Sequence, residues 1–416
     1  MNYNPIEKDF WGELNPEQLV DKYGTPLYVY NEGIIRERCH ELKKLLPYSW
    51  FTVNYSAKAN SNLELLKIIK REGLNADAVS PGEIFFLLKA GFRPDQILFI
   101  TNNITTGEMK YAVEQGVTVS LDSLSQLSIF GRLHPGQSVS VRFNPGVGAG
   151  HHEKVNTGGE NTKFGVDADL VEDVKRIAAQ FSLKIVGINQ HIGSLFLHGE
   201  PYVEGVKTLL EIASHFPDLE FIDFGGGFGI PYHRLDGEKR LDLSALAEKL
   251  DQILTGWMKK YGREIKVKIE PGRYLVAESG VLLGRVTAVK QNHSRKYVGT
   301  DIGFNVLMRP VIYNSYHEIS VFRNGASVVT GEQEEVTVVG NICESGDILG
   351  QKRNLPLLNE GDLVVVWDAG AYGYSMASNY NLRLRPAEVL ITTSGEDKLI
   401  RRRDTFEDLL RNLSEH

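Results

Sequence analysis

Short apolar or β-branched runs recur along the first two thirds of the chain. Between them, apolar residues return every three or four positions, as in Leu63, Leu66 and Ile69, which is the spacing of an amphipathic helix. Strands that alternate with helices are typical of βα units joined in a parallel sheet. The pattern predicts eight such strands, at residues 51–55, 76–79, 96–100, 117–121, 138–143, 184–189, 221–224 and 267–269.

Eight strands of this kind favour a closed, TIM-like (β/α)8 barrel, which typically takes about 250 residues. Past residue 280 the helical spacing disappears. Runs at 284–289, 334–340 and 363–367, separated by Gly, Asn and Asp, predict antiparallel strands. Residues 26–30 form one more candidate strand. We therefore expect a barrel domain at 31–279 and an all-β, sandwich- or barrel-like domain made of 1–30 and 280–416, which contributes residues to the substrate site. A surface helix is expected at 406–413.

Composition narrows the class of protein. The 416 residues are 42% hydrophobic and 24% charged, which excludes a disordered chain, a collagen and a disulfide scaffold. A net charge of −7 argues against a nucleic-acid partner. No apolar run reaches 18 residues and no signal peptide is evident, so we expect no membrane partner. With only two cysteines, the chain is expected to be a cytoplasmic enzyme in a reducing compartment.

Polar or glycine-rich residues follow most of the predicted strands, where the catalytic groups of such barrels lie. Lys58 follows the first strand, the glycine run 225–229 follows the seventh, and Glu270 follows the eighth. A pyridoxal phosphate site needs an amine for the aldehyde, donors for the phosphate and a carboxylate for the ring nitrogen, and these residues supply all three. Taken singly, a lysine is most often a surface charge, and a glycine run is as often a tight turn. His191 is able to stack on a cofactor ring, although a lone histidine is more often structural.

The sequence resembles the fold type III pyridoxal-phosphate decarboxylases. The resemblance implies an alanine-racemase-like barrel, a β domain and pyridoxal 5'-phosphate as cofactor. The matching segments run in family order at 55–60, 191–194, 225–229, 270–273, 343–347 and 370–374.

Further segments are most similar to the diaminopimelate branch of that family. This likeness implies decarboxylation of meso-2,6-diaminopimelate to L-lysine and CO2, the last step of lysine biosynthesis. Arg273 and Arg309 are suited to substrate carboxylates because a guanidinium binds them bidentately, and Glu344 is suited to the distal ammonium. The segments that carry the likeness lie at 150–165, 308–317, 378–381 and 385–389.

The resemblance also assigns roles to single residues. It implies that Lys58 and Cys343 are catalytic, and that Cys343 protonates the carbon left by CO2 in the barrel of a partner subunit, so that active sites lie at a homodimer interface. Cys39, inside a helical stretch, is expected to be a packing residue. The implied cofactor-binding residues are Lys58, Asp77, His191, Ser194, Gly226, Gly227, Glu270, Gly272, Arg273 and Tyr372. The implied substrate-binding residues are Arg273, Arg309, Tyr313, Glu344 and Tyr372.

Other interpretations stay open on the sequence alone. The nearest is a decarboxylase of the same fold that acts on another basic amino acid, such as D-ornithine, D-lysine or carboxynorspermidine. A racemase and a non-catalytic protein of the pyridoxal-phosphate fold are more remote, and the glycine spacing disfavours a dinucleotide-binding reductase. The pair His151 and His152 has no further ligands at metal spacing, so we expect no metal. The glycine-rich stretch 146–159 is expected to be a mobile loop that closes on substrate.

Overall fold

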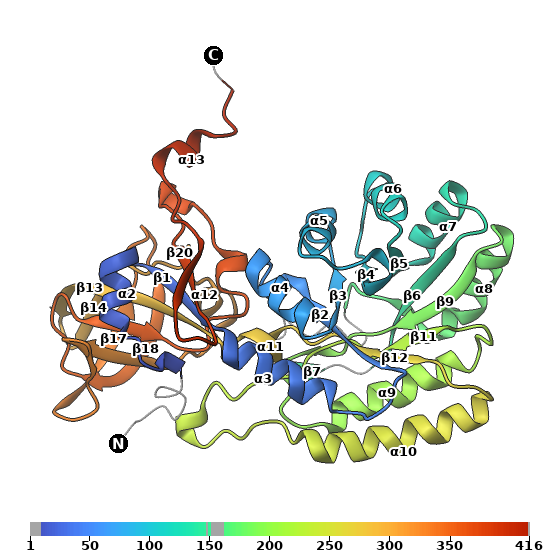
Figure 1. Cartoon of the computed structure of the whole chain (residues 1–416), viewed down its shortest axis with the longest axis horizontal. Coiled ribbons are helices and arrows are strands. Elements are labelled where there is room, and N and C mark those ends of the chain that lie inside the picture. The colour runs from blue at the N-terminus through green and yellow to red at the C-terminus, as the bar shows by residue number, and fades with distance from the viewer. Residues whose placement is uncertain (1–9, 147–148, 151–161, 415–416) are drawn as a thin grey trace. The chain divides into compact units, whose positions relative to one another are not determined.

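The computed structural model describes residues 10–146, 149–150 and 162–414. The chain divides into two compact units (Figure 1). The barrel unit comprises Glu37–Ile230 and Arg240–Leu275, and the β unit comprises Met1–Arg36, Pro231–Lys239 and Val276–His416. The expected mobile loop at 146–159 and the pair His151 and His152 lie largely or wholly outside the described residues.

Eight parallel strands close into a barrel, which confirms the expected fold. Their order around the barrel is β5-β4-β3-β2-β12-β11-β9-β6, and pairing of β5 with β6 closes the circle. Each predicted strand is present, and no end differs by more than one residue. The eight strands are β2 (Phe51–Ser56), β3 (Asn75–Ala78), β4 (Ile97–Ile100), β5 (Thr118–Leu121), β6 (Ser138–Asn144), β9 (Lys184–Asn189), β11 (Phe221–Asp223) and β12 (Lys266–Ile269).

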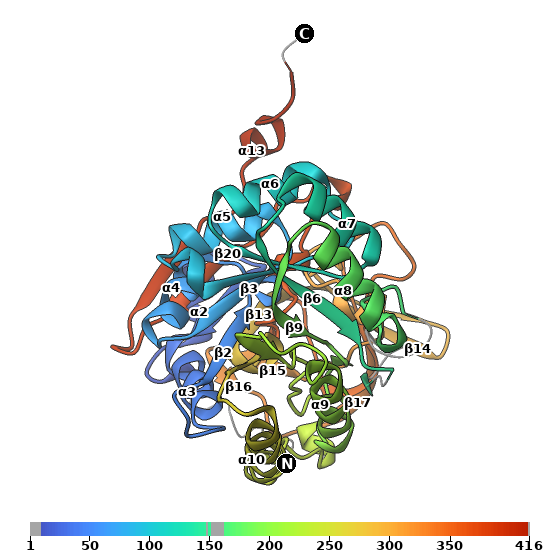
Figure 2. The same cartoon turned by 90° about the vertical axis from the view of Figure 1, so that its right-hand side faces the viewer.

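Amphipathic helices lie around the outside of these strands (Figure 2). The helix after β2, for example, begins at a cap in which Asn62 accepts the backbone N–H of Glu64, and it buries Leu65, Leu66 and Ile69. Short β7 (Ala149–Gly150) pairs with β10 (Gly193–Ser194), and β8 (Val166–Asp167) pairs with β6. These helices are α3 (Glu32–Lys43), α4 (Leu63–Arg71), α5 (Pro81–Lys89), α6 (Thr106–Glu114), α7 (Leu124–Leu133), α8 (Val171–Gln180), α9 (Glu200–Ala213) and α10 (Leu243–Tyr261). A short, buried helix, α11 (Arg273–Val276), follows β12.

The β unit is built on a sheet in which β1, from the start of the chain, lies between β13 and β20. The expected N-terminal strand therefore belongs to this unit. The three runs expected to form antiparallel strands each have an antiparallel neighbour, as β13 pairs with β19 and β17 with β18. Two pairs that were not predicted are parallel: β1 with β20, and β14 with β17. Parallel neighbours need a long crossover, and the whole barrel separates β1 from β20. The strands are β1 (Leu27–Asn31), β13 (Gly280–Asn292), β14 (Arg295–Thr300), β15 (Ile319–Arg323), β16 (Ala326–Ser327), β17 (Gln333–Val339), β18 (Ile348–Pro356), β19 (Leu363–Val366), β20 (Ala387–Ile391) and β21 (Asp397–Arg401).

The core of the β unit packs against one face of this sheet. Trp367 is 1% exposed there and contacts Phe10 and Trp11 edge to face. Helices α2 (Pro16–Tyr23) and α12 (Arg309–Tyr313) belong to the unit. The expected tail helix is present as α13 (Phe406–Leu410), three residues shorter than predicted, and its apolar residues Phe406 and Leu410 are exposed.

Candidate active site

The inside of the barrel is polar, whereas large branched apolar residues fill most barrels of this kind. Side chains alternate between the two faces of a strand, and the register places Asp223 beside Asn189 and beside Lys268. Arg142 is also paired with Asn189. A small apolar cluster occupies part of the same unit, formed by Leu98, Ile100, Val186 and Phe221. The polar residues at the inward positions include Thr52, Asn54, Ser56, Asp77, Ser120, Ser140, Arg142, Asn189, Asp223 and Lys268.

Lys58 lies in a short 3-10 turn, Ala57–Ala59, that directly follows β2. The preceding residue, Ser56, joins three strand ends: its Oγ donates to Asp77 Oδ2 at 2.5 Å and to the Glu270 carbonyl at 3.0 Å. The positive charge of Lys58 lowers the pKa values of both Asp77 and Glu270, against the larger opposing effect of burial. The lysine is therefore close to two buried carboxyl groups at the end of the barrel where its catalytic residues were expected.

Glu270 and Asp223 form a pair of buried carboxyl groups, 4% and 0% exposed. Burial raises the pKa of Glu270 well above its usual range, and the nearby Asp223 raises it further. Glu270 Oε1 and Asp223 Oδ2 have no hydrogen-bond donor among the residues that the structure describes. Because two adjacent carboxylates repel each other, one proton shared between them is the state that this geometry favours.

His191 is held as a neutral imidazole. Burial lowers its pKa well below the usual range, and the charges of Lys58 and Arg142 lower it further. The backbone N–H of Gly226 donates to His191 Nδ1 at 3.1 Å, so the proton of the neutral ring lies on Nε2. A neutral, fixed imidazole is suited to stacking on an aromatic cofactor ring without repelling a protonated ring nitrogen.

The glycine run after β11 is a tight turn whose shape depends on the absence of side chains. Gly225 has a φ of +71°, and a Cβ there would lie 2.2 Å from the carbonyl oxygen of Gln190. A Cβ on Gly226 would lie 2.0 Å from the carbonyl oxygen of Glu270. The N–H of Gly225 donates to Asp223 and that of Gly226 to His191, so these two amides serve the turn itself. The turn thus lies against Asp223, His191 and Glu270 and keeps these three residues close together.

Arg273 and Ser194 contact each other in the same unit. Arg273, 6% exposed, follows β12, and its Nη2 donates to Ser194 Oγ at 2.9 Å. A buried guanidinium beside a hydroxyl is suited to a phosphate group. An amine, an anion site and an unsatisfied buried carboxyl oxygen on Glu270 are the groups that pyridoxal phosphate requires, so the residues present fit this cofactor.

The other predicted site residues belong to the β unit. Arg309, 1% exposed, lies over the Tyr232 ring, 4.7 Å from its centroid, and contacts His317 Nε2 at 2.7 Å. His317 Nδ1 lies 2.7 Å from the carbonyl oxygen of Trp367. His317 therefore donates through Nδ1 and accepts from Arg309 through Nε2, which fixes the position of the guanidinium.

Cys343 and Glu344 are exposed on the loop between β17 and β18, whereas Cys39 is fully buried, as expected for a packing residue. Tyr313 and Tyr372 are half-buried. Tyr372 has a φ of +56°, a left-handed backbone conformation that is uncommon for a residue with a bulky side chain and that is found at functional sites.

The structure brings nine predicted residues together in the barrel unit and leaves five in the β unit. Sequence reasoning missed Asp223, which binds the glycine turn and faces Glu270. It also left Arg142, Asn189 and Gln190 without a role. A signal was available, because polar residues recur at every second position of several apolar strands, as in Ser140 and Arg142. The nine residues are Lys58, Asp77, His191, Ser194, Gly226, Gly227, Glu270, Gly272 and Arg273, and the five are Arg309, Tyr313, Cys343, Glu344 and Tyr372.

Two further properties concern the described residues only. No helix among them is long and apolar enough to cross a membrane. Within the same part of the chain, no group of three or more His, Cys, Asp and Glu side chains is arranged to hold a metal ion.

Comparison with known proteins relates this site to one enzyme family. Residues 32–277 match the family described as pyridoxal-dependent decarboxylase, pyridoxal binding domain. A diaminopimelate decarboxylase of Methanothermobacter thermautotrophicus is 44% identical over 409 residues, which cover 96% of this chain and 94% of that protein. The crystal structure of diaminopimelate decarboxylase from Helicobacter pylori, complexed with L-lysine, is 32% identical with a TM-score of 0.87, covering 95% of this chain and 98% of that one.

A more distant structure shares the fold alone. The lysine/ornithine decarboxylase of Vibrio vulnificus, complexed with cadaverine, has a TM-score of 0.77 and 21% identity, and the match covers 90% of this chain and 95% of that one.

Proposed function

Since this chain belongs to the family of pyridoxal-dependent decarboxylases, we propose that it converts meso-2,6-diaminopimelate to L-lysine and CO2. The placement of Lys58 beside the buried pair Glu270 and Asp223 carries the chemical part of the proposal, because this set suits pyridoxal phosphate. The full-length likeness to diaminopimelate decarboxylases supports the choice of substrate. The reaction is the last step of lysine biosynthesis.

The protein's own residues bind and tune the cofactor. When bound, pyridoxal phosphate supplies an aldehyde for amines and a ring that accepts the electrons left behind as CO2 departs. Lys58 would provide the amine that holds the aldehyde. Glu270 would hold a proton at the ring nitrogen, and His191, which burial keeps neutral, would stack on the ring. Residues proposed to hold the phosphate and its surroundings are Ser194, Gly226, Gly227, Gly272, Arg273 and Tyr372. Asp77 is proposed as a further cofactor-binding residue.

Recognition of the distal end of the substrate falls to the β unit in this proposal. Diaminopimelate carries an amino-acid group at each end, so the end that does not react needs partners for a carboxylate and an ammonium. Arg309 is proposed for the carboxylate and Glu344 for the ammonium, with Tyr313 beside them. The contacts of Arg309 with His317 and Tyr232 hold its guanidinium in one orientation before substrate binds.

For this reason Arg309→Lys is expected to raise KM for diaminopimelate about tenfold, because a lysine keeps the charge and loses the bidentate geometry. The same change is expected to have little effect on slow decarboxylation of lysine, which lacks the distal carboxylate. Steady-state kinetics on both amino acids check the difference, and thermal melting shows whether the buried site still folds. Equal losses on both substrates would remove the recognition role of Arg309.

Cys343 is proposed to donate the proton that replaces CO2 on the product, acting in the barrel of a partner subunit within a homodimer. The thiol is exposed on the described chain. In the same unit Phe406 and Leu410, on α13, are 71% and 62% exposed. Exposed apolar residues one helical turn apart are typical of a surface that associates with another chain. A cytoplasmic location belongs to the proposal as well, supported by the presence of only two cysteines in the chain.

Subunit complementation tests this arrangement. Lys58→Ala and Cys343→Ala are each expected to be inactive in lysine formation. A refolded equimolar mixture is expected to recover about a quarter of wild-type activity, since half of the dimers are mixed and one of their two sites carries both residues. No recovery, with mixed dimers present by native mass spectrometry, would contradict sharing of residues between subunits.

The substrate proposal is tested with a panel of amino acids on the purified holoenzyme. We expect equal amounts of CO2 and lysine from meso-2,6-diaminopimelate, with a preference in kcat/KM of at least about a hundredfold over D-ornithine, D-lysine and carboxynorspermidine. Release of CO2 mainly from one of these would favour the same-fold alternative. Racemisation without CO2 would indicate a racemase, and no turnover with cofactor bound would indicate a binding protein.

A further inference from the structure

The loop that carries Cys343 and Glu344 is held in place by a second segment of the β unit, residues 378–383. The two stretches run side by side in opposite directions. At the centre of the contact, the backbone N–H of Cys343 donates to Asn381 Oδ1 at 2.9 Å. The position of the proposed proton donor along its loop is therefore set by an asparagine side chain 38 residues further along the chain.

Contacts on either side extend this pairing. Tyr380 Oη donates to Glu344 Oε1 at 2.6 Å, and the bond to Glu344 raises the pKa of Tyr380. The ring of Tyr380 stacks on Phe304, with centroids 5.6 Å apart and planes 23° apart. At the other end, Arg383 Nη2 donates to the carbonyl oxygen of Asn341 at 2.8 Å. Asn341, Cys343 and Glu344 of the loop thus each have a hydrogen-bond partner in residues 378–383.

A buried carboxylate anchors the base of the same loop. Asp347, 3% exposed, accepts the backbone N–H of Phe304 and of Ile342, each at 2.7 Å. This carboxylate holds the ends of the loop, but neither of its bonds reaches Cys343 or Glu344. At the exposed tip, the backbone of Glu344 bonds to Ile342 and Asp347 within the loop, and the contacts from outside the loop come from Asn381 and Tyr380.

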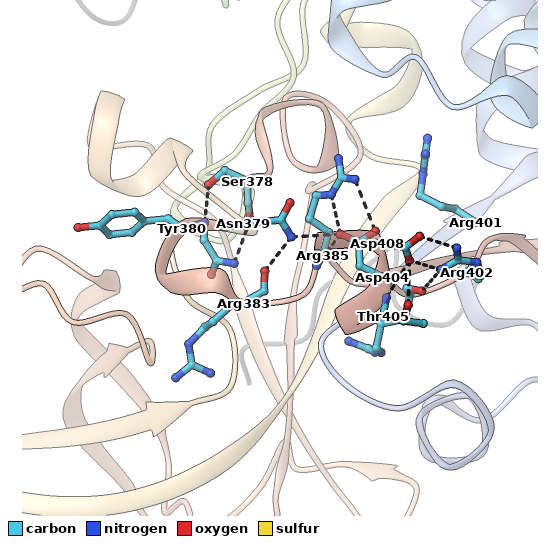
Figure 3. Close-up of polar contacts among 12 residues, drawn as sticks. Ser378, Asn379, Tyr380, Arg383, Arg385, Arg401, Arg402, Asp404, Thr405 and Asp408 are labelled. Carbon is cyan, nitrogen blue, oxygen red and sulfur yellow. Dashed lines mark hydrogen bonds and ion pairs between the residues drawn. The ribbon is translucent and has the colours of Figure 1, made fainter. Parts of the chain in front are cut away.

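The supporting segment is itself fixed to the polypeptide that leads to α13 (Figure 3). Asn379 Nδ2 donates to the carbonyl oxygen of Arg383 at 2.9 Å and to Asp404 Oδ2 at 3.1 Å. Arg385 Nε donates to the same Asp404 oxygen at 2.8 Å. These bonds hold residues 379–385 in a compact turn. Tyr380 and Asn381 therefore belong to a stretch of backbone that Asp404 fixes in place.

Asparagine is well suited to this position for two physical reasons. Asn381 has φ +54° and ψ +24°, a left-handed conformation that asparagine and glycine tolerate better than other residues. Its amide oxygen also supplies the acceptor that the Cys343 N–H requires. The next residue, Leu382, is left-handed as well, with φ +53°, but its side chain is 71% exposed. The two neighbours thus share a backbone conformation, and it is the side chain of Asn381 that accepts the N–H of Cys343.

We propose that Asn381 and Tyr380 are positioning residues for the decarboxylase reaction: Asn381 sets where the Cys343 thiol meets the product carbon, and Tyr380 orients Glu344 toward the distal ammonium of the substrate. The proposal rests on the proposed function, and specifically on the roles given there to Cys343 and Glu344. It adds two residues outside the cofactor site and assigns one to proton delivery and the other to substrate recognition.

For Asn381 the decisive readout is the amount of lysine formed per CO2 released. Asn381→Gly keeps the left-handed backbone and removes the acceptor, so it is expected to slow lysine formation about tenfold to a hundredfold, as a misplaced catalytic group does. CO2 leaves before the proton arrives, so a misplaced thiol would let part of the protons reach the cofactor instead of the product carbon. The cofactor would then keep the amino group and water would release the product as an aldehyde, so the ratio of lysine to CO2 is expected to fall below one. The visible absorbance of the bound cofactor and the melting temperature are expected to stay at wild-type values.

Two matched variants make this test specific. Asn381→Asp keeps an oxygen at the same reach and is expected to restore a ratio of one. Leu382→Gly makes the same backbone change at the neighbouring position and is expected to behave as wild type. If Asn381→Gly matches Leu382→Gly in rate and in ratio, Asn381 has no positioning role. Equal loss in Asn381→Asp and Asn381→Gly would also overturn the proposal.

For Tyr380 the readout is whether Tyr380→Phe changes KM for diaminopimelate or kcat. Tyr380→Phe removes one hydroxyl and keeps the ring that stacks on Phe304. We expect KM for diaminopimelate to rise about two- to tenfold, the range for one hydrogen bond, with the ratio of lysine to CO2 unchanged. In combination with Glu344→Gln the effects are expected to be less than additive, because both changes act on one contact. Full additivity, or a loss confined to kcat, would overturn the role of Tyr380.

The variant Cys343→Ala distinguishes a failure of the proposed proton-donor role from a failure of the positioning role of Asn381. If Cys343→Ala forms lysine and CO2 in equal amounts at the wild-type rate, the proton-donor role is overturned, and the role of Asn381 with it. If Cys343→Ala lowers the ratio and Asn381→Gly does not, only the positioning role fails. The KM measurement on Tyr380→Phe is independent of both outcomes.

Discussion

Lys58→Ala is expected to abolish turnover, with a loss of about 10⁴-fold or more, the scale seen when a covalent group is removed from an active site. The same variant is expected to lose the visible absorbance that arises when the cofactor aldehyde is bonded to a lysine amine. The physical reason is the position of Lys58, which follows β2 directly and lies near Asp77 and Glu270 in a barrel interior.

The control for this experiment is Lys58→Arg. It keeps the positive charge that offsets the two buried carboxyl groups, so it is expected to fold at least as well as Lys58→Ala while remaining inactive. Borohydride reduction of the wild-type holoenzyme, followed by peptide mass spectrometry, should locate the cofactor on the peptide that contains Lys58. Decarboxylation by Lys58→Ala at a rate near wild type, or a reduced adduct on another peptide, would contradict the assignment.

Glu270→Gln is expected to lower kcat about a hundred- to a thousandfold, the scale for loss of one preorganised electrostatic partner of the reacting group. A glutamine retains the shape of the side chain, and its amide is able to donate to Asp223, so the barrel is expected to fold. It has no negative charge with which to hold a proton at the ring nitrogen. Steady-state kinetics together with the absorbance spectrum of the loaded protein check the prediction. An unchanged kcat would exclude Glu270 as the partner of the ring nitrogen.

The cofactor-free protein offers a second readout for Glu270. Its folded-state pKa is raised by burial above the ordinary value of 4.5, so the folded state keeps its proton at pH values where the unfolded chain has lost it. Such a group makes the protein less stable as pH rises from about 4.5 towards the raised pKa. Glu270→Gln removes this contribution. Its melting temperature is expected to fall less than that of the wild type over this range.

The control here is Glu264→Gln. Glu264 is exposed and lies just before β12, at the opposite end of the strand from Glu270. Its replacement is expected to leave the pH dependence of melting unchanged. If the wild type and Glu270→Gln melt in parallel across the range, the raised pKa of Glu270 is contradicted.

The barrel was predictable because each of its strands is a local feature. A run such as 97–100 is apolar, is bounded by turn residues and is followed by a helical pattern, and these signals lie within some twenty residues of sequence. Lys58 and Glu270 were found for the same reason, since each stands directly after a strand. The parallel pairing of β1 with β20 was missed, because no local pattern shows that the first strand of the chain lies between β13 and β20.

The electrostatic character of the site was not predictable in this way. Asp223 is the last residue of a short strand in the sequence, and it acquires a role only where the glycine turn and Glu270 surround it. The same holds for His191, whose neutral state follows from burial near Lys58 and Arg142. Asn381 belongs to a segment that the sequence marked as family-like, but its bond to Cys343 joins residues 38 positions apart.

The sequence by itself determined the order of the strands, the closed barrel and the identity of the groups that the cofactor requires. These depend on side-chain spacing and on the rule that parallel strands present their carboxyl ends at one face. The tertiary structure decided which of those groups carry a charge and which residues hold them in place. Desolvation and hydrogen bonding depend on every neighbour in space, and in this protein the neighbours of Glu270 and Cys343 come from distant parts of the chain.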